Sequence, residues 1–353
     1  MIAILQPLIP HYRTAFFERL GDELDMDIYC YLPESAHSKS GLGKSDINYS
    51  IVRNVRGAGV VIYNPFVFLN KKYSVLVLML HVGHLSTWLL LLTRPFHRKR
   101  IILWGHGISI KRYLKETEKP NRLLKWMIAL SSGAMFYTTN ELNIWKKKFE
   151  KKKMVAINNT VAIKDPVLLD NSKAQLRDQL AVKQEIVLIL CARFNTLDRR
   201  MDLFLEVVKG LDKEKFGFII IGSGDFKPDF STFDNVYDFG AVYDAGTKAA
   251  LFNAADIYFQ PAWLGLSVVE AMSYGKPVFT FKRSSTVLQC VEYGYVRDGE
   301  NGLIFNHPND LVNKLNQLTS EEITRMGRNA YLYVKQHLQM NNMVNNTLTL
   351  MNS

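Results

Sequence analysis

The chain has 353 residues, enough for roughly two domains, and 48% of them are hydrophobic, which excludes global disorder. Its net charge is +11, and the excess is local: residues 94–153 hold sixteen lysines and arginines against four glutamates, whereas the rest of the chain is nearly neutral. A confined basic face implies an acidic partner, which could be an anionic membrane leaflet, a lipid diphosphate or nucleic acid.

The first part of the chain alternates apolar and amphipathic segments. The first residues lack the charged region and cleavage site of a signal peptide, so we expect them to form a strand. The pattern predicts a helix at 13–24 and strands at 2–6, 26–32, 59–63, 75–80, 101–104, 134–137 and 155–158. Strands separated by helices predict a doubly wound parallel sheet. Turn residues dominate 34–50, which predicts a mobile loop.

Residues 73–93 contain no charged side chain and are long enough to span a bilayer. His81, Gly83 and His84 interrupt the middle of this stretch, so we interpret it instead as a strand at 73–80, a turn, and a buried helix at 85–92. The two histidines do not predict a metal site, because no carboxylate or third ligand stands beside them.

Two basic segments predict a membrane surface. Residues 122–130 form an apolar helix that carries Trp126, and six lysines surround Phe149 in 146–153, next to Trp145. Basic residues beside aromatic ones suit an anionic interface. The alternatives are a solvated helix end beside a core helix, a patch that steers phosphates, and a nucleic-acid surface, although no nucleic-acid-binding motif is recognisable.

A second domain begins after a polar linker at 162–182. The sequence predicts a second doubly wound sheet with strands at 185–191, 218–221, 236–239, 257–259 and 278–281, followed by helices at 309–318, 320–337 and 340–350. Cys30, Cys191 and Cys290 are scattered along both halves, which is typical of reduced thiols in a cytosolic protein.

Residues 265–278 carry the strongest local signal. The strand at 257–259 is followed by Gly265, which we expect to allow a close backbone turn, and by a helix at 266–274 that ends at Gly275. A helix that begins at the carboxyl end of a parallel strand favours an anion there, because its first N–H groups have no partner within the helix. Glu270 lies about one turn into this helix and could accept hydrogen bonds from ribose hydroxyls, so the arrangement fits a nucleoside diphosphate.

The same stretch resembles a known family. Gly265-Leu266, Glu270-Ala271-Met272 and Gly275-Lys276-Pro277-Val278 are similar to the donor-site signature of retaining, nucleotide-sugar-dependent glycosyltransferases of family 4, which have the two-domain GT-B fold. The family often has two glutamates with seven residues between them; Glu270 matches the second, which binds the ribose, whereas Ala262 stands at the position of the first. The resemblance implies two Rossmann-like domains that face a central cleft, and it implies that Gly265, Leu266 and Ser267 contribute to donor binding.

Further candidates stand at other strand ends, where ligands of open α/β sheets bind. Arg193 resembles the first phosphate-binding cation of the family, and Arg199 resembles the second better than its neighbour Arg200 does. Both would hold the leaving diphosphate, a role that suits the planar guanidinium group. Gly222 lies in a Gly-Ser-Gly turn near the nucleotide, and Tyr243 could stack on the base or be an ordinary turn residue.

The first domain offers fewer matches. His106 lies between Gly105 and Gly107 at a predicted strand end, where glycines would let a ligand approach, and a histidine of the family often contacts the transferred sugar there. His11 and Arg13 follow the first strand, where this chain lacks the glycine-rich loop of the family, so we assign them only to the cleft and to the acceptor or diphosphate. Asn140 and Glu141 are weaker candidates at another strand end.

Together these features predict a retaining hexosyltransferase that moves a sugar from a nucleotide diphosphate sugar to a lipid-linked saccharide or glycolipid. We expect an acceptor-binding domain at 1–165, a donor-binding domain at 166–335, and a last helix at 336–353 that packs back on the first domain. The resemblance implies no metal or other cofactor, and the setting would be bacterial surface polysaccharide assembly on the inner face of the cell membrane. The alternatives are a nucleotide-sugar epimerase of the same fold, a non-catalytic binding scaffold, and a basic nucleic-acid binder.

Overall fold

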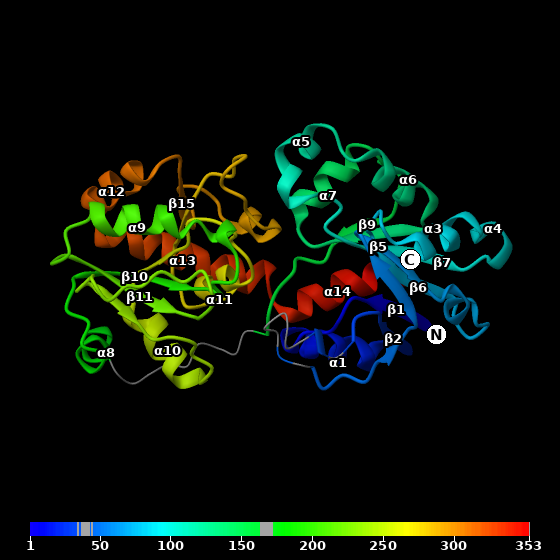
Figure 1. The fold of residues 1–353 in the computed structure, drawn as a ribbon, viewed down its shortest axis with the longest axis horizontal. Helices are drawn as coiled ribbons and strands as arrows, with labels where there is room; N and C mark the ends of the chain where they lie inside the picture. The colour runs from blue at the N-terminus through cyan, green and yellow to red at the C-terminus, as the bar shows by residue number, and fades with distance from the viewer. Residues whose placement is uncertain (34, 37–42, 44, 163–171, 353) are drawn as a thin grey trace. The chain divides into compact units, whose positions relative to one another are not determined.

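The computed structural model describes all residues except 34, 37–42, 44, 163–171 and 353. The chain forms two compact units, one made of Met1–Ala162 with Gln339–Ser353 and the other of Ile163–Leu338 (Figure 1). Parts of the predicted loop at 34–50 and of the predicted linker at 162–182 lie outside the described residues.

The first unit is built on a parallel sheet with the strand order β3-β2-β1-β6-β7-β8-β9. Its strands are β1 (Ile2–Gln6), β2 (Met26–Cys30), β3 (Ser50–Ile51), β6 (Val75–Met79), β7 (Arg100–Gly105), β8 (Gly133–Phe136) and β9 (Met154–Ala156). Its helices are α1 (Thr14–Glu23), α3 (Leu85–Leu92), α4 (Arg94–His97), α5 (Tyr113–Glu118), α6 (Arg122–Leu130), α7 (Thr139–Lys146) and α14 (Met340–Met351). The doubly wound parallel sheet expected from the sequence is therefore confirmed.

Two apolar layers cover the faces of this sheet. On one face, α1 contributes Phe16, Phe17 and Leu20, and α14 contributes Met343 and Leu350. On the other face, side chains of α3, α6 and α7 are buried against the strands, among them Leu90, Leu91, Leu124, Met127 and Trp145. Figure 1 shows α14, in red, beside α1, in blue, so the end of the chain completes the core of the first unit.

The stretch at 73–93 folds as β6, a turn and α3, as the strand-and-helix interpretation predicted. None of the helices that the structure describes combines the length and the apolarity needed to cross a bilayer.

The predicted strand at 59–63 is not part of the parallel sheet. β5 (Val60–Tyr63) instead pairs antiparallel with β4 (Asn54–Gly57), which was not predicted. The two residues that connect them, Ala58 and Gly59, have φ angles of 47° and 78°. A two-residue turn with both φ angles positive matches the twist of a hairpin, so this local turn decides the pairing.

The second unit contains a parallel sheet with the order β12-β11-β10-β13-β14-β15. Its strands are β10 (Ile186–Cys191), β11 (Phe216–Ile221), β12 (Val236–Asp238), β13 (Ile257–Phe259), β14 (Val278–Phe281) and β15 (Gly302–Phe305), of which β15 was not predicted. Its helices are α8 (Lys173–Gln179), α9 (Met201–Gly210), α10 (Ala245–Ala254), α11 (Ser267–Ser273), α12 (Pro308–Gln317) and α13 (Ser320–His337).

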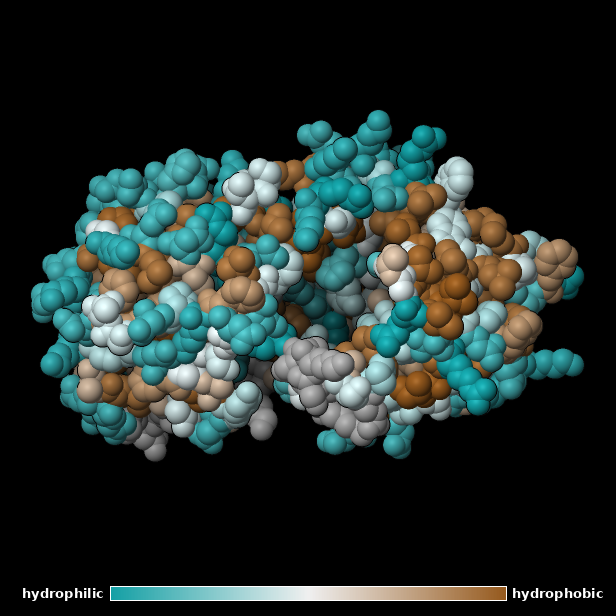
Figure 2. Space-filling view, in the orientation of Figure 1, coloured by the Kyte–Doolittle hydropathy of each residue, from teal (hydrophilic) through white to brown (hydrophobic). Residues whose placement is uncertain are grey.

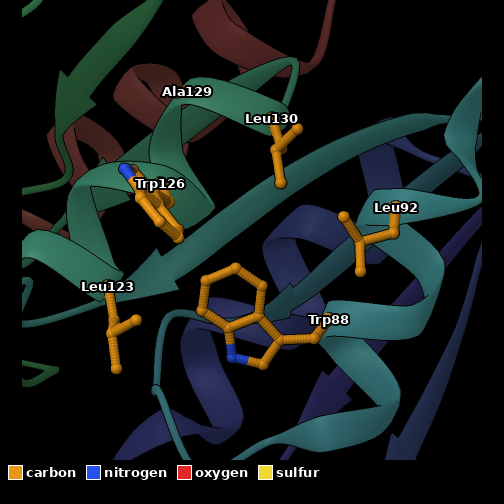
Figure 3. A pocket seen from close by; sticks show the side chains of 6 residues that line it. All are labelled: Trp88, Leu92, Leu123, Trp126, Ala129 and Leu130. Carbon is orange, nitrogen blue, oxygen red and sulfur yellow. The ribbon is translucent and has the colours of Figure 1, made fainter.

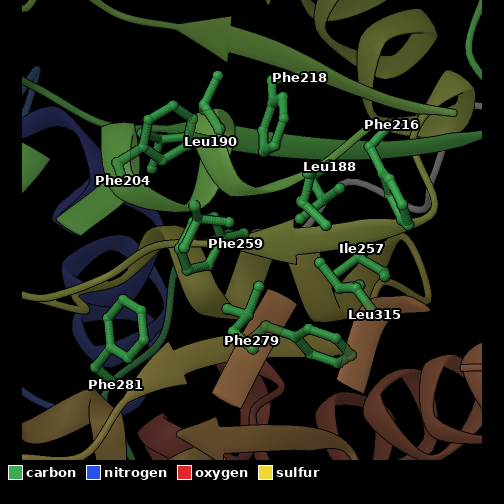
Figure 4. Packing of buried hydrophobic residues seen from close by; sticks show 14 of the residues in the cluster. Leu188, Leu190, Phe204, Phe216, Phe218, Ile257, Phe259, Phe279, Phe281 and Leu315 are labelled. Carbon is green, nitrogen blue, oxygen red and sulfur yellow. The ribbon is translucent and has the colours of Figure 1, made fainter. Parts of the chain in front are cut away.

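One face of this sheet carries an aromatic core. Phe204 of α9 packs against Phe218 of β11 and Phe259 of β13, and its ring centroid lies 5.5 Å from the centroid of each (Figure 4). Leu311 and Leu315 of α12 close the same layer. Because these side chains alternate with residues on the opposite face of each strand, the packing fixes the register of the strands and the place where each strand ends.

Candidate active site

The candidate donor residues lie where the strand order of the second unit reverses. β10 pairs with β11 on one side and with β13 on the other. After β10 the chain adds β11 and β12 on one side of the sheet, and from β13 on it adds strands on the other side, so the order reverses between β10 and β13. Ligands of open α/β sheets bind beyond the carboxyl ends of strands at such a reversal. The segments that follow β10, β11 and β13 contain Arg193, Gly222 and Gly265, which places these three predicted residues at one edge of the sheet.

The loops after β10 and β11 are locked to each other. The N–H of Phe194 donates to the carbonyl of Ser223 at 2.9 Å, and the N–H of Phe226 donates to the carbonyl of Phe194 at 2.8 Å. Gly222 has a φ of 129°, and a Cβ atom there would lie 1.8 Å from the carbonyl oxygen of Ala192. This fold therefore requires a glycine at 222 whether or not a nucleotide approaches it.

Two buried glutamines hold the loop that precedes α11. Gln260 donates to the carbonyls of Ala262 at 2.9 Å and Trp263 at 2.8 Å. Gln289 accepts from the N–H of Leu264 at 2.9 Å and donates to the carbonyl of Pro261 at 3.1 Å. A loop satisfied from inside in this way is positioned before any ligand arrives.

The loop explains the missing first glutamate. The side chain of Ala262 is fully buried in the aromatic core, so a carboxylate at this position would be placed among apolar side chains. Trp263, with a φ of 56°, takes the left-handed conformation that makes the turn. The expectation that Gly265 provides this turn is wrong: its φ is outside the left-handed range, and a Cβ atom there would meet no atom within 4 Å.

Glu270 forms an ion pair with a lysine that the sequence analysis did not single out. The Nζ atom of Lys248 on α10 lies 2.7 Å from a carboxylate oxygen of Glu270 on α11. Desolvation disfavours the charged lysine, but the nearby Cys191 and Glu270 together raise the pKa of Lys248. Both side chains keep about a quarter of their surface exposed, so hydroxyl groups of a ligand can still reach the carboxylate.

Arg199 and Arg200 have different roles. Arg200 is held by Asp202, with their closest atoms 2.5 Å apart, and donates to the carbonyl of Thr286 at 2.9 Å. Arg199 instead donates to the carbonyl of Arg193. Desolvation is the main cause that lowers the pKa of Arg199, and Arg193 acts in the same direction. The structure therefore separates the two candidates and leaves Arg199 as the cation beside Arg193.

Charged side chains gather around the end of β10. The pKa of the Cys191 thiol is raised to about 12, mainly because the thiol is desolvated, and the charges of Lys248, Glu270 and Arg199 also act on it. These three side chains come from three different elements, so the fold brings them together at one point. In such a group the cations can bind a diphosphate while the carboxylate accepts a hydrogen bond from a sugar hydroxyl.

The other predicted donor residues occupy distinct places. The hydroxyl of Ser267 accepts from the hydroxyl of Tyr258 at 2.8 Å, which ties the start of α11 to β13. Leu266 is the residue before α11 and is partly exposed. Tyr243 follows β12 and is 93% exposed, so its ring is not packed against the described residues of the second unit. Lys276 lies in the family-like motif but is buried, where it donates to the carbonyl of Ala255 at 2.7 Å, and burial lowers its pKa to about 8.

The first unit places Arg13 in a ring of aromatic side chains. Its guanidinium carbon lies between 5.6 and 5.8 Å from the ring centroids of Tyr12, Trp104 and Tyr137. Arg13 also donates to the side-chain oxygen of Asn159 at 2.5 Å and is only 7% exposed. The cation is thus stabilised mainly by rings and a neutral amide.

His106 lies next to this group, at the end of β7. Its ring is 4.5 Å from the ring of Tyr137, and it is exposed at the carboxyl edge of the sheet. Although part of the side chain is open to solvent, the surrounding protein desolvates the imidazole, and this desolvation, followed by the charge of Arg13, lowers the pKa of His106 to about 4. His11 is also exposed, and its backbone N–H donates to the carbonyl of Gly43 at 2.9 Å.

The glycines beside His106 have a packing role in addition to the ligand approach that the sequence suggested. A Cβ atom at Gly107 would lie 2.6 Å from the ring of Phe136, and one at Gly105 would lie 3.0 Å from the backbone of Leu80. Both glycines are therefore required by the packing around the strand end.

The weaker candidates of the first unit have structural roles or stand apart. Glu141 is buried and accepts from the hydroxyl of Tyr113 at 2.7 Å, whereas Asn140 is exposed. His84 is buried, which lowers its pKa to about 4, and its ring lies 5.2 Å from that of His81. Among the described residues, no group of three or more His, Cys, Asp and Glu side chains could hold a metal ion.

Comparison with known proteins identifies the second unit. Residues 185–321 match the family model described as glycosyl transferases group 1. This segment is a group 1 glycosyltransferase domain. No characterised protein sequence matches the chain closely enough to count as a relative.

Solved structures share the fold of the whole chain. HepE of Anabaena, in complex with UDP, is 13% identical over 99% of each chain, with a TM-score of 0.68. WaaB, a lipopolysaccharide outer core galactosyltransferase in its apo form, is 13% identical over 99% of this chain and 98% of its own, with a TM-score of 0.64. A putative UDP-N-acetylglucosamine 2-epimerase from Listeria monocytogenes is 12% identical over 100% of this chain and 95% of its own, with a TM-score of 0.60. At this identity the likeness shows a common GT-B-like fold.

Several residues of the group 1 glycosyltransferase domain escaped the sequence analysis. Lys248 lies in an alanine-rich helix with no motif around it, so only the fold reveals its contact with Glu270. Gln260 and Gln289 were also missed. A polar residue directly after the apolar strand β13 was the one available signal for Gln260, since buried polar groups need partners.

The predicted membrane surface outside the group 1 glycosyltransferase domain needs one correction. Trp145 is fully buried and donates to the carbonyl of Gly107 at 2.9 Å, so it cannot contribute to an interface. Its neighbour Phe149 packs on the same core and is only partly exposed. Trp126, by contrast, is 59% exposed. The aromatic part of this surface therefore lies on α6, whereas the lysines after α7 stand without an exposed tryptophan.

Proposed function

We propose that the protein is a retaining glycosyltransferase that moves a hexose from a nucleotide diphosphate sugar to a lipid-linked saccharide or glycolipid. The observation that carries the proposal is the group of charges around the end of β10 within a group 1 glycosyltransferase domain: Glu270 with Lys248, and Arg199 beside Arg193. Retention and the hexose rest on the family resemblance.

In this proposal the second unit binds the donor. Arg193 and Arg199 hold the diphosphate and stabilise the charge that develops on it as the sugar leaves. Glu270 accepts hydrogen bonds from the ribose, the backbone at 265–267 approaches the phosphates, and Tyr243 stacks on the base. Because two arginines supply the positive charge, the reaction needs no metal ion, and a chelator is expected to leave turnover unchanged.

The first unit supplies contacts for the sugar and the acceptor. His106 is neutral at physiological pH, so it binds or polarises the transferred sugar as a hydrogen-bonding group. Arg13 is too enclosed to serve a large group directly and acts by holding Tyr137 and Asn159 in place beside His106. His11, exposed after β1, is the residue assigned to the acceptor.

The setting that we propose is surface polysaccharide assembly at the inner face of the bacterial cell membrane. The basic surface of the first unit would keep the protein there as a peripheral protein, with no role in nucleic-acid binding. The similarity in fold to the lipopolysaccharide enzyme WaaB is in keeping with this setting.

A thermal-shift screen against nucleoside diphosphates and nucleotide sugars tests the donor site. HepE binds UDP, which makes UDP the first diphosphate to try. A ligand at about 100 times its dissociation constant is expected to stabilise the fold by roughly 2.7 kcal/mol. A shift with one diphosphate, and a larger one with one of its sugars, would support the proposal. No shift with any of them in folded protein would contradict it.

An epimerase is the second candidate, because a structure named as a putative epimerase shares the fold. An epimerase would convert the nucleotide sugar without any acceptor, so product analysis after incubation with the sugar alone separates the two activities. A non-catalytic scaffold is the third candidate, suggested by Ala262 at the position of the first glutamate of the family. A scaffold would bind the nucleotide and convert nothing even with acceptor present.

Glu270→Ala is expected to weaken nucleoside diphosphate binding by roughly 1–3 kcal/mol, because the ribose hydroxyls lose a charged acceptor. Titration calorimetry measures this change. Glu206→Ala on α9 removes an exposed carboxylate elsewhere in the unit and serves as the matched control, with unchanged affinity. Equal affinity in the wild type and in Glu270→Ala would remove Glu270 from the site.

A further inference from the structure

An apolar groove runs between α3 and α6 on the surface of the first unit. It is lined by Trp88 and Leu92 of α3 and by Leu123, Trp126, Ala129 and Leu130 of α6 (Figure 3). Its volume of about 540 Å³ is in the range of small-molecule sites. The indole N–H of Trp88 already donates to the carbonyl of Val82 at 2.9 Å. The Trp88 ring therefore offers the groove only its carbon atoms.

The groove lies in a larger exposed apolar surface. Leu85, Leu89 and Leu92 of α3 are between 46% and 61% exposed, as are Leu123 and Trp126 of α6. Figure 2 shows hydrophobic residues gathered over α3 and α6 on the face toward the viewer. Soluble proteins rarely expose contiguous apolar surface of this kind unless it binds something.

Cations stand at one end of the groove. Arg94 donates to the carbonyl of Leu130 at 3.0 Å, and Lys152 donates to the carbonyls of Ala129 at 2.9 Å and Ser131 at 2.6 Å. Desolvation and then the charge of Arg94 lower the pKa of Lys152, so the two cations are close. Both cations donate to the last carbonyls of α6, and no ion pair joins either of them to a carboxylate among the residues that the structure describes.

Two acidic side chains of this unit form ion pairs away from the groove. Of the ion pairs among its described residues, one joins Lys72 to Asp27 and another joins Arg112 to Glu116. No Asp or Glu occurs in the sequence between residues 71 and 115, which includes all of α3 and α4. The cationic end of the groove is therefore complementary to an anion joined to an apolar chain.

The topology places this end away from the candidate active site. α3 follows the carboxyl end of β6 and returns to the amino edge of the sheet, where Arg94 precedes β7; α6 and Lys152 reach the same edge ahead of β8 and β9. His106 and Arg13 follow β7 and β1 at the opposite, carboxyl edge. A lipid whose headgroup sits at Arg94 and Lys152 is therefore not the acceptor of the proposed reaction.

We propose that the groove between α3 and α6 binds one hydrocarbon chain of an anionic membrane phospholipid, whose phosphate lies at Arg94 and Lys152. The site is a non-catalytic lipid anchor. It goes beyond the proposed transferase activity, because it would hold the first unit to a bilayer whether or not a sugar is transferred.

Monomeric dodecyl phosphate tests the site in the full-length protein through tryptophan fluorescence. We expect binding to shift the emission of Trp88 and Trp126 to shorter wavelength, and the affinity to increase roughly fourfold for each methylene added between decyl and dodecyl phosphate. Inorganic phosphate is expected to cause no shift. Equal effects of inorganic phosphate and dodecyl phosphate would overturn the proposal, because the chain would then contribute nothing.

Ala129→Phe is the decisive variant, since it fills the groove and keeps the surface apolar. It is expected to weaken dodecyl phosphate binding by about tenfold or more. It should also abolish quenching by phosphatidylglycerol vesicles with brominated acyl chains. Phe96→Ala, which removes a ring that is 86% exposed outside the groove, is the matched control and should behave as the wild type. Wild-type binding by Ala129→Phe would overturn the proposal.

Two further measurements complete the test. If Ala129→Phe does not unfold like the wild type on heating, the exposed Leu92→Gln replaces it, and undiminished binding by that variant counts against the groove. A concentration-dependent dimer that Ala129→Phe dissociates would show that a second copy covers the groove and would also overturn the proposal. The thermal shift caused by the nucleotide should be the same in all these variants. It tests the transferase proposal independently of the lipid site.

Discussion

Arg199→Ala is expected to lower the rate of nucleotide release from the donor sugar by about 10²–10³-fold. The departing diphosphate gains negative charge in the transition state, and Arg199 lies beside Arg193 at the end of β10 with its main competitor for that role already engaged. Its desolvated surroundings strengthen each charge interaction. The loss corresponds to roughly 3–4 kcal/mol of transition-state stabilisation. The rate is measured with the nucleotide sugar found in the thermal-shift screen.

The adjacent arginine provides the control for this prediction. Arg200→Asn removes a guanidinium of the same kind one residue away, and asparagine tolerates the left-handed conformation that Arg200 adopts, with a φ of 53°. Because Arg200 is bound to Asp202 and Thr286, this variant should lose some stability and keep the wild-type rate. A similar loss of rate in both variants would mean that the positive charge of the loop as a whole, rather than the position of Arg199, governs catalysis.

Much of the fold follows from periodic apolar patterns. The strand at 257–259 and the helix at 320–337 have the predicted bounds because each is a continuous run with clear end signals, such as the cap at Thr319, whose hydroxyl accepts from the backbone N–H of Glu322. The hairpin of β4 and β5 escaped prediction because its turn depends on Ala58 in the left-handed region, which alanine rarely adopts. β15 was missed because it begins at Gly302, a residue of low strand propensity. Glycine is needed there because a Cβ atom would lie 2.0 Å from the carbonyl oxygen of Val278 on the neighbouring strand.

The candidate site was predictable only in part, because some of its contacts join residues that are distant in the sequence. Glu270, Arg193 and Arg199 stand in local motifs whose spacing along the chain can be read directly. Lys248 reaches Glu270 from another helix, twenty-two positions away in the sequence, and this contact depends on how α10 and α11 pack. Trp145 shows the opposite case: the lysines around it suggested an exposed ring, but its indole is buried beside Gly107. Charge in the neighbouring sequence does not decide on which side of a helix an aromatic ring lies.

Two glycines of the candidate site are expected to respond to alanine in opposite ways. Gly222→Ala should destabilise the fold by about 4 kcal/mol or more, because the new Cβ atom would lie 1.8 Å from the carbonyl oxygen of Ala192 and the φ of 129° is unfavourable for alanine. Gly265→Ala should change stability by no more than about 0.5 kcal/mol, since its Cβ atom would meet no atom within 4 Å. Chemical denaturation measures both changes.

The affinity for a nucleoside diphosphate then distinguishes the structural role of Gly222 from the ligand-binding role of Gly265. The open space beside Gly265 lies directly before α11, where we propose that the diphosphate binds, so Gly265→Ala should weaken nucleoside diphosphate binding by about tenfold while the protein remains as stable as the wild type. Gly222→Ala, if it folds at low temperature, should lose affinity only in proportion to its unfolded fraction. Wild-type affinity in Gly265→Ala would place the phosphates elsewhere along the strand ends, and a stable Gly222→Ala would mean that the loops after β10 and β11 can separate without cost.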